Sequence, residues 1–238
     1  MWLAIETATD RASVALGSDE ADVLEAEIMG ARRHAGALLP LIQELLARRG
    51  VKLDAVHGVV LSDGPGSFTG LRVGASVAKA LVQTRGIELW TAPSLMVRAA
   101  GVARDGAPVL AIADALRGDV YAAAYRFAGT SVQTVLAPTV RRPQALAAET
   151  ARPDVIVGDA PAAIVESLEG WAGRPMIRPP EGAPHARWLI GLTGRSGGAA
   201  RIEGVTGWEP VYGRPAEAQV RWEITHGRPL PDSVGGSR

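Results

Sequence analysis

The feature that most restricts the fold of this chain is a glycine-rich loop between an apolar run and a helix of small residues. The stretch SDGPGSFTGLRVGASVAKAL covers residues 62–81. Its glycines permit positive φ angles and close backbone approach, and its proline stiffens the turn. A serine or threonine is suited to cap the helix that follows. The loop residues are Gly64, Pro65, Gly66, Ser67, Phe68, Thr69 and Gly70.

Two interpretations of this loop stay open from its residues alone. A glycine-rich turn that leads into a helix N-terminus is suited to bind anions, so a partner or nucleotide contact is one interpretation. The other is a purely structural turn, because the loop lacks the GxxxxGK[ST] pattern and the next lysine is Lys79.

Two apolar helices are predicted on either side of one strand. The first covers residues 34–49 and has Gly50 just past its end, where a C′ glycine belongs. The second covers residues 71–84 and is small or apolar nearly all round. An apolar stripe this wide is typical of a core helix, or of one that contacts a partner as well. We expect the partner interface to include His34, Leu38, Leu39, Ile42, Leu45, Leu46, Leu71, Gly74, Ala75 and Ala78.

The order of predicted elements indicates the fold. Apolar runs at 2–5, 12–16 and 23–29 predict three strands, and helix, strand, helix, strand follow up to residue 91. This is the order of the ribonuclease H-like fold. The second half starts again with predicted strands at 109–113, 120–127 and 132–136, a helix at 145–150 and a strand at 154–157. Residues 170–184 are rich in Gly and Pro and predict a loop, and 186–194 predict a helix.

We therefore predict an α/β protein with two tandem ribonuclease H-like domains of the actin-like ATPase superfamily, the second of them degenerate. The predicted domains are residues 1–105, with the two apolar helices, and residues 106–228. Residues 229–238 are predicted to be a disordered tail.

Composition narrows the classes of function. Lys plus Arg and Asp plus Glu are 25 each, so the formal net charge is zero. A protein that binds RNA by itself usually has a basic excess, so any contact with nucleic acid is expected to be indirect. The chain has no cysteine, which excludes disulfides and thiolate metal sites. Its N-terminal residues lack a basic region and no run reaches the length of a membrane span, so we expect a cytoplasmic protein without a membrane contact.

Several motifs of the sequence resemble those of the TsaB (YeaZ) family. The family has a GPGSFTGLR loop followed by a small-residue helix, as residues 64–81 do. Further matches are RRHAGALLPLIQELL at 32–46, Ser94 with Leu95, DALRGDVYAAAY at 114–125 and EPVYGR at 209–214. The resemblance covers most of the chain and is weakest between about residues 128 and 208.

The resemblance implies a role in the biosynthesis of threonylcarbamoyladenosine on tRNA. It implies a non-catalytic scaffold that binds and activates a paralogous transferase, TsaD, and that forms a homodimer when TsaD is absent. A TsaE-like ATPase completes the complex. No cofactor is implied for the isolated subunit, and the resemblance leaves room for ATP or ADP only at the interface of the complex.

The metal site of the paralogue is not expected here. The resemblance places the paralogue's HxxxH helix at residues 91–100, where Ser94 and Arg98 stand in the histidine positions. Histidines four residues apart on a helix can chelate one ion, whereas these two side chains cannot. Neither HExxH nor GxSxG occurs. His34 is expected to cap its helix or to contact solvent.

Three alternative functions are carried forward. An active ATPase or kinase of the actin-like superfamily is disfavoured because ETATD at residues 6–10 lacks the DxGT-like hairpin, and Glu6 is expected to be structural. A glycopeptidase-like protein is disfavoured by the missing metal motif. Asp114 and Asp119 suggest a carboxylate pair, but a salt bridge to Arg117 explains them more simply. A dimerising module with another partner is the third alternative.

Overall fold

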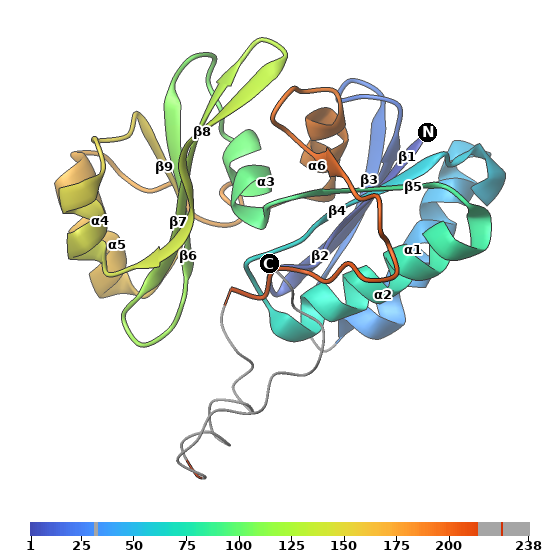
Figure 1. The fold of residues 1–238 in the computed structure, drawn as a ribbon, viewed down its shortest axis with the longest axis horizontal. Coiled ribbons are helices and arrows are strands. Elements are labelled where there is room, and N and C mark those ends of the chain that lie inside the picture. Colours follow the sequence, from blue (N-terminus) through green and yellow to red (C-terminus); the bar gives the residue numbers. More distant parts are fainter. Residues whose placement is uncertain (31–32, 214–224, 226–238) are drawn as a thin grey trace.

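The computed structural model describes residues 1–30, 33–213 and 225. The predicted tail at 229–238 lies outside these described residues. The chain forms two sheets with helices beside and between them (Figure 1).

The first sheet carries the predicted N-terminal meander. Strands β1 to β3 pair antiparallel, and β4 and β5 extend the sheet in parallel from the other side of β1. The strand order is β10-β5-β4-β1-β2-β3. Its strands are β1 (Trp2–Glu6), β2 (Arg11–Gly17), β3 (Val23–Met29), β4 (Gly58–Ser62), β5 (Glu88–Ala92) and β10 (Ala200–Arg201).

The second sheet repeats the first in shorter form. Its strands are β6 (Pro108–Asp114), β7 (Val120–Ala128), β8 (Ser131–Arg141) and β9 (Val155–Asp159), in the order β8-β7-β6-β9. Again three strands form an antiparallel meander and the fourth lies parallel to the first of them. The chain thus has two tandem ribonuclease H-like domains of the actin-like type. The second is degenerate, because among the described residues its sheet has no counterpart of β5.

Six α-helices of the described residues form three layers around the sheets (Figure 1). Helices α1 (His34–Arg49) and α2 (Phe68–Arg85) cover one face of the first sheet. Helices α3 (Ser94–Ala100) and α6 (Ala186–Thr193) fill the space between the two sheets. Helices α4 (Pro143–Glu149) and α5 (Ala162–Ala172) cover the outer face of the second sheet. Every described helix is too short or too polar to cross a bilayer.

The helix ends follow the expected local rules. Gly50 ends α1 and Gly86 ends α2, both with a left-handed φ that suits glycine at C′. Ser67 caps α2, where its side chain accepts a hydrogen bond from the Gly70 N–H. Helix α5 was not predicted: its last turn lies in the segment 170–184 that was expected to be loop. The glycines that suggested a loop there include Gly173, which ends the helix with a φ of 69°.

The chain returns to the first domain after completing the second sheet. The sequence placed all residues from 106 to 228 in the second domain, but α6 packs on β1 and β2, and β10 pairs with β5. Two backbone N–H groups at the start of α6 bind first-domain side chains: Ala186 N–H donates to Ser13 Oγ at 2.8 Å and Arg187 N–H to Glu25 Oε1 at 3.2 Å. The apolar side chains of α6 lie against the sheet, which explains why the segment does not stay with the second domain.

Candidate functional site

The glycine-rich loop lies directly on the turn between β1 and β2. The Ser67 N–H donates to the Ala8 carbonyl at 2.7 Å, and a Cβ on Gly66 or Gly70 would overlap with the carbonyls of Ala8 and Thr7. Gly64 has a φ of 109°, which only glycine adopts without strain. The glycines are therefore explained by packing, and the N–H groups of Ser67 and Gly70 already have partners inside the chain.

The loop is also the place where three of the sequence motifs meet. The Val211 N–H of the EPVYGR segment donates to the Asp63 carbonyl at 2.7 Å. The ring of Tyr212 lies 4.6 Å from that of Phe68. Gly213 packs against the ring of Tyr121 from the DALRGDVY strand and against Pro65 of the loop. Segments around residues 63–68, 121 and 211–213, far apart in sequence, thus form one surface.

We call residues 202–213 the strap, because they run along the outside of α2 after β10 (Figure 1). Lys79 of α2 forms a 3.0 Å salt bridge with Glu209 and lies 5.7 Å from the Trp208 ring. The Arg72 guanidinium lies 4.3 Å from the Phe68 ring, beside Tyr212. The polar side of α2 therefore binds the strap. Sequence reasoning missed this contact, although the aromatic residues in a Gly- and Pro-rich segment are a signal for it.

Most of the residues predicted to form the partner interface lie in the core of the first domain instead. The interface itself stays a prediction, but its residues need correction: Ile42 is 4% exposed, and Leu38 and Leu45 are fully buried. They pack against the sheet, because the broad apolar stripe of α1 serves the core first. The other buried members of the predicted set are His34, Leu71, Gly74, Ala75 and Ala78. Leu39, at 53% exposed, and the half-buried Leu46 remain on the surface.

His34 is buried and does not contact solvent, contrary to expectation. Its Nε2 lies 3.2 Å from the Asp10 carbonyl. A carbonyl only accepts, so Nε2 carries the proton and donates. This bond ties the start of α1 to the β1–β2 turn.

The predicted position of the missing histidine pair lies between the two domains. Ser94, which is 4% exposed, donates from Oγ to the Pro65 carbonyl, and its N–H donates to the Gly64 carbonyl at 2.8 Å. Arg98, also 4% exposed, donates from Nη1 to the Gly182 carbonyl at 3.0 Å. Burial lowers the pKa of Arg98 to about 10, and the charges of Asp159 and Glu6 oppose the shift. Among the described residues, no cluster of three His, Cys, Asp or Glu side chains is placed to hold a metal.

Glu6 is fully buried at the carboxyl end of β1. Burial raises its pKa to about 7, although the Ala8 N–H donates to its Oε1 and Ser62, Arg98 and His185 favour its charge. Its second oxygen has no hydrogen-bond partner. Burial likewise raises the pKa of the nearby Asp63 to about 6, against an opposing hydrogen bond with Thr91.

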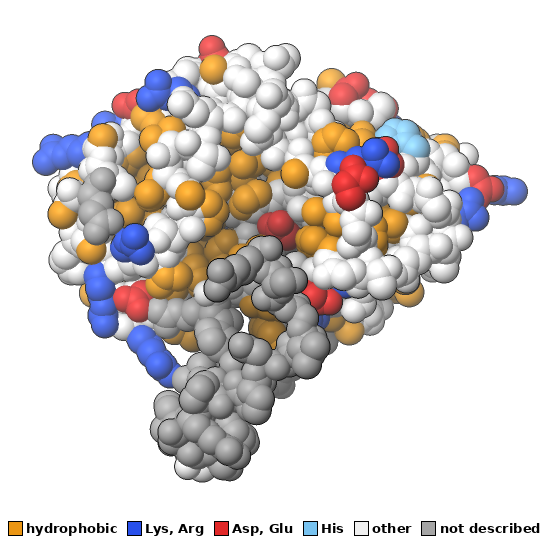
Figure 2. Space-filling view, in the orientation of Figure 1, with side chains coloured by type: hydrophobic (Ala, Val, Ile, Leu, Met, Phe, Trp, Pro, Cys, Tyr) orange, Lys and Arg blue, Asp and Glu red, His pale blue; other side chains and the backbone are white. Residues whose placement is uncertain are grey.

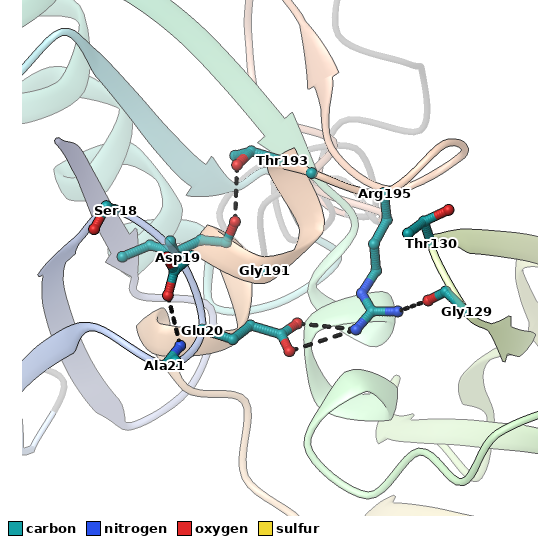
Figure 3. Close-up of a pocket in the computed structure, with 11 residues that line it drawn as sticks. Ser18, Asp19, Glu20, Ala21, Gly129, Thr130, Gly191, Thr193 and Arg195 are labelled. Atoms are coloured by element: carbon teal, nitrogen blue, oxygen red, sulfur yellow. Dashed lines mark hydrogen bonds and ion pairs between the residues drawn. The ribbon is translucent and has the colours of Figure 1, made fainter.

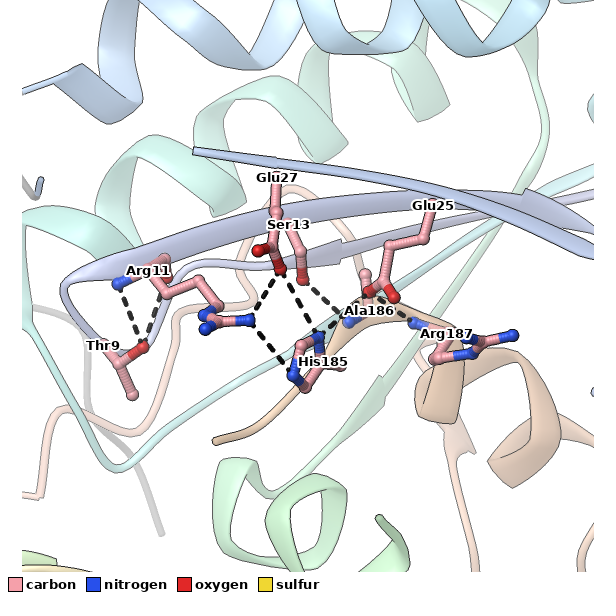
Figure 4. Close-up of polar contacts among 8 residues, drawn as sticks. All are labelled: Thr9, Arg11, Ser13, Glu25, Glu27, His185, Ala186 and Arg187. Carbon is pink, nitrogen blue, oxygen red and sulfur yellow. Dashed lines mark hydrogen bonds and ion pairs between the residues drawn. The ribbon is translucent and has the colours of Figure 1, made fainter. Parts of the chain in front are cut away.

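His185 joins the start of α6 to the first sheet (Figure 4). Its Nε2 lies 3.2 Å from Arg11 Nη1, and its Nδ1 lies 3.7 Å from carboxylate oxygens of both Glu25 and Glu27. Arg11 also pairs with Glu27 at 2.7 Å. This polar cluster holds α6 to β2 and β3 and explains why the helix begins at Ala186.

The two carboxylates of the suggested pair have separate structural contacts, and the salt bridge involves a different arginine from the one expected. Asp119 pairs with Arg142 at 2.9 Å, and Asp114 Oδ1 accepts from the Leu116 N–H at 2.8 Å. Leu116 and Arg117 both have positive φ, which turns the loop sharply between β6 and β7. A salt bridge therefore explains Asp119, but its partner is Arg142 and not the expected Arg117.

A shallow groove lies where hairpin turns of the two domains meet (Figure 3). The turn between β2 and β3 contributes Asp19 and Glu20, and the turn between β7 and β8 contributes Gly129. Arg195 joins them, because it pairs with Glu20 at 3.2 Å and donates to the Gly129 carbonyl at 2.5 Å. The groove's charged side chains thus serve mainly to connect the domains.

Comparison with known proteins agrees with the motifs. A family model described as TsaD, tRNA N6-adenosine threonylcarbamoyltransferase, matches residues 28–170, more than half of the chain. The protein named "tRNA threonylcarbamoyladenosine biosynthesis protein TsaB" of Escherichia coli (strain K12) is 36% identical over 146 residues, which cover 58% of this chain and 63% of that protein. The chain belongs to the TsaB (YeaZ) branch of this family.

Two further TsaB/YeaZ proteins match over more of their length. The Bacillus subtilis (strain 168) protein of the same name is 27% identical over 232 residues, which cover 92% of this chain and 96% of that one. The solved structure of YeaZ from Pseudomonas aeruginosa is 29% identical with a TM-score of 0.66, over 81% of this chain and 90% of that chain. The match to the Escherichia coli relative spans less than two thirds of its length.

Proposed function

We propose that this chain takes part in the biosynthesis of threonylcarbamoyladenosine on tRNA, as a non-catalytic subunit that binds and activates a TsaD-like transferase. The names of its TsaB relatives support the pathway. One observation carries the non-catalytic part. Ser94 and Arg98, which stand in the positions of the expected histidine pair, are both buried and both engaged in hydrogen bonds inside the chain. A buried guanidinium repels a cation, so this position is unsuited to a metal-dependent reaction.

The proposed binding surface for the TsaD-like subunit is the outer side of α1 together with the side of α2 that carries Val73 and Val77, away from the polar side that binds the strap. The two helices lie side by side on the first sheet (Figure 1). Leu39 is 53% exposed, and Leu46, Val73 and Val77 are half-buried. Large apolar side chains at the surface of a helix pair favour association with another helical surface. In the proposal the same surface forms a homodimer when the transferase is absent.

The remaining partners follow from the same proposal. A TsaE-like ATPase joins the complex, and ATP or ADP binds only at the interface of the complex, so that the isolated subunit needs no cofactor. The zero net charge favours an indirect role toward tRNA, with the phosphate contacts made by another subunit. The pathway acts on tRNA and therefore in the cytoplasm.

The pathway is tested by depletion of the protein in its own cell, with threonylcarbamoyladenosine in bulk tRNA measured by mass spectrometry. Loss of the nucleoside, restored by a plasmid copy of the wild type, is the expected result. An unchanged nucleoside level under verified depletion would contradict the proposal and favour a dimerising module with another partner.

The binding surface is tested with two matched variants, Leu39→Asp and Val135→Asp. Val135 lies on β8 of the second domain and is 51% exposed, so both changes place a carboxylate at a similarly exposed apolar position. The control also tests a rival surface, because hydrophobic side chains are spread over the visible face of the second domain (Figure 2). We expect Leu39→Asp to weaken binding of a purified TsaD-like subunit at least tenfold in calorimetry, and Val135→Asp to leave it unchanged. The reverse result would move the interface to the second domain.

A further inference from the structure

The side chain of Arg98 lies between the two domains, near the carboxyl ends of their parallel strands. Glu6 ends β1 of the first sheet, and Asp159 ends β9 of the second. In open α/β sheets this edge is where ligands bind. Here Arg98 of α3 interacts electrostatically with both carboxyl groups. Among the described residues, it is the only buried lysine or arginine.

The hydrogen bond of Arg98 adds a second contact to the second domain. Its acceptor, the Gly182 carbonyl, belongs to the segment that runs from α5 to α6. That segment is attached to β9, because Ile177 bridges Val157 and accepts a hydrogen bond from the Gly158 N–H at 3.0 Å. It then reaches the first sheet, where Ala186 binds Ser13. Arg98 thus holds the segment that runs from the second domain back to the first.

We propose that Arg98 is an internal latch: its buried guanidinium, on α3 between the two sheets, holds the Gly182 carbonyl of the segment that returns to the first domain and so fixes the relative position of the two domains. A buried cation without a direct carboxylate contact is costly unless several groups share its charge. The carbonyl of Gly182 supplies the direct contact, and the negative charges of Asp159 and Glu6 also favour the charged guanidinium. Opening the domains would expose the guanidinium to water and break its bond to Gly182.

The pKa of Glu6 provides a measurement of the electrostatic effect of Arg98, and the groups around Glu6 determine the expected direction of its change. Ser62 on β4, Arg98 on α3 and His185 before α6 all favour its charged form. Arg11 lies beyond His185. Removing the Arg98 charge is therefore expected to raise the pKa of Glu6 further, whereas a change that only loosens the packing would admit water and lower it.

The latch is tested by measuring interdomain distances in Arg98→Met, which keeps an unbranched apolar stem and removes the guanidinium and its charge. The chain has no cysteine, so Gln83→Cys on α2 and Ser167→Cys on α5, both exposed, can be spin-labelled uniquely. The matched control is Arg178→Met, because Arg178 is 53% exposed and only 3.8 Å from the same Asp159. We expect a narrow distance distribution in the wild type and in Arg178→Met, and a distribution at least twice as wide in Arg98→Met. A distribution of native width in folded Arg98→Met would overturn the proposal.

A second variant covers the case in which Arg98→Met does not fold. Arg98→Lys keeps a charge near Glu6 but lacks the planar group that reaches Gly182. We expect a widened distance distribution, while the carboxyl resonance of ¹³C-labelled Glu6 titrates within about half a pH unit of its position in the unchanged chain. A native distance distribution in the Lys variant would overturn the role of the Gly182 bond, and a Glu6 titration unchanged in Arg98→Met would overturn the electrostatic link.

Discussion

The buried carboxyl of Glu6 makes the stability of this protein depend on pH in a direction opposite to that of most carboxylates. Its pKa rises from 4.5 to about 7 in the folded chain, with burial as the main cause. The folded state therefore holds this proton more tightly than the unfolded state between those two values. The stabilising contribution of the protonated form is complete below about pH 4.5 and is lost as pH rises toward 7.

The size of the effect follows from the shift. Each pKa unit corresponds to about 1.4 kcal/mol, so the difference between pH 4.5 and pH 8 is about 3 kcal/mol for this one group. Glu6→Gln keeps the shape of the side chain and removes the titration. We expect the free energy of unfolding of Glu6→Gln, relative to the wild type, to increase by about 2.5 kcal/mol from pH 5 to pH 8.

Urea unfolding at a series of pH values, followed by circular dichroism, measures this difference. The comparison between the two chains is essential, because Asp63 also has a raised pKa and contributes a slope of the same sign to both. If the free energies of unfolding of the two chains differ by the same amount at every pH, the reasoning is refuted, because Glu6 then has no raised pKa in the folded state.

Two further predictions concern the first domain. Leu38→Ala, at a fully buried position of α1, should lower the free energy of unfolding by about 2–5 kcal/mol in urea, whereas Leu39→Ala beside it should lower it by less than about 1 kcal/mol; equal losses would contradict the assigned faces of α1. Gly64→Ala should lower the melting temperature by several degrees, because a Cβ there would overlap with the Val211 carbonyl at a φ of 109°. Gly36→Ala, in open space on α1, is its control and should not lower it.

The elements that could be predicted from sequence are those fixed by local chemistry. The runs at 109–113 and 120–127 became β6 and β7, and Gly50 ended α1, because strand periodicity and a left-handed glycine act within a few residues. The duplicated strand order could also be read, since each half presents the same succession of apolar runs.

What could not be predicted depends on contacts between distant residues. The apolar stripe of α1 is wide enough for a core helix or for one that also contacts a partner, but it does not indicate that Leu38 and Ile42 face the sheet while Leu39 faces outward. Arg98 has no local signal for burial, since its partner Gly182 is 84 residues away. The strap was missed for the same reason: the Lys79–Glu209 pair spans 130 residues.

The return of α6, β10 and the strap to the first domain has a consequence for the order in which the protein is made. When the ribosome has synthesised residues 1–105, the first sheet still lacks β10, and the face of β1 and β2 that α6 will cover is exposed. The second domain, in contrast, has its four strands by residue 159. The domain that begins first during translation is therefore the last to be completed.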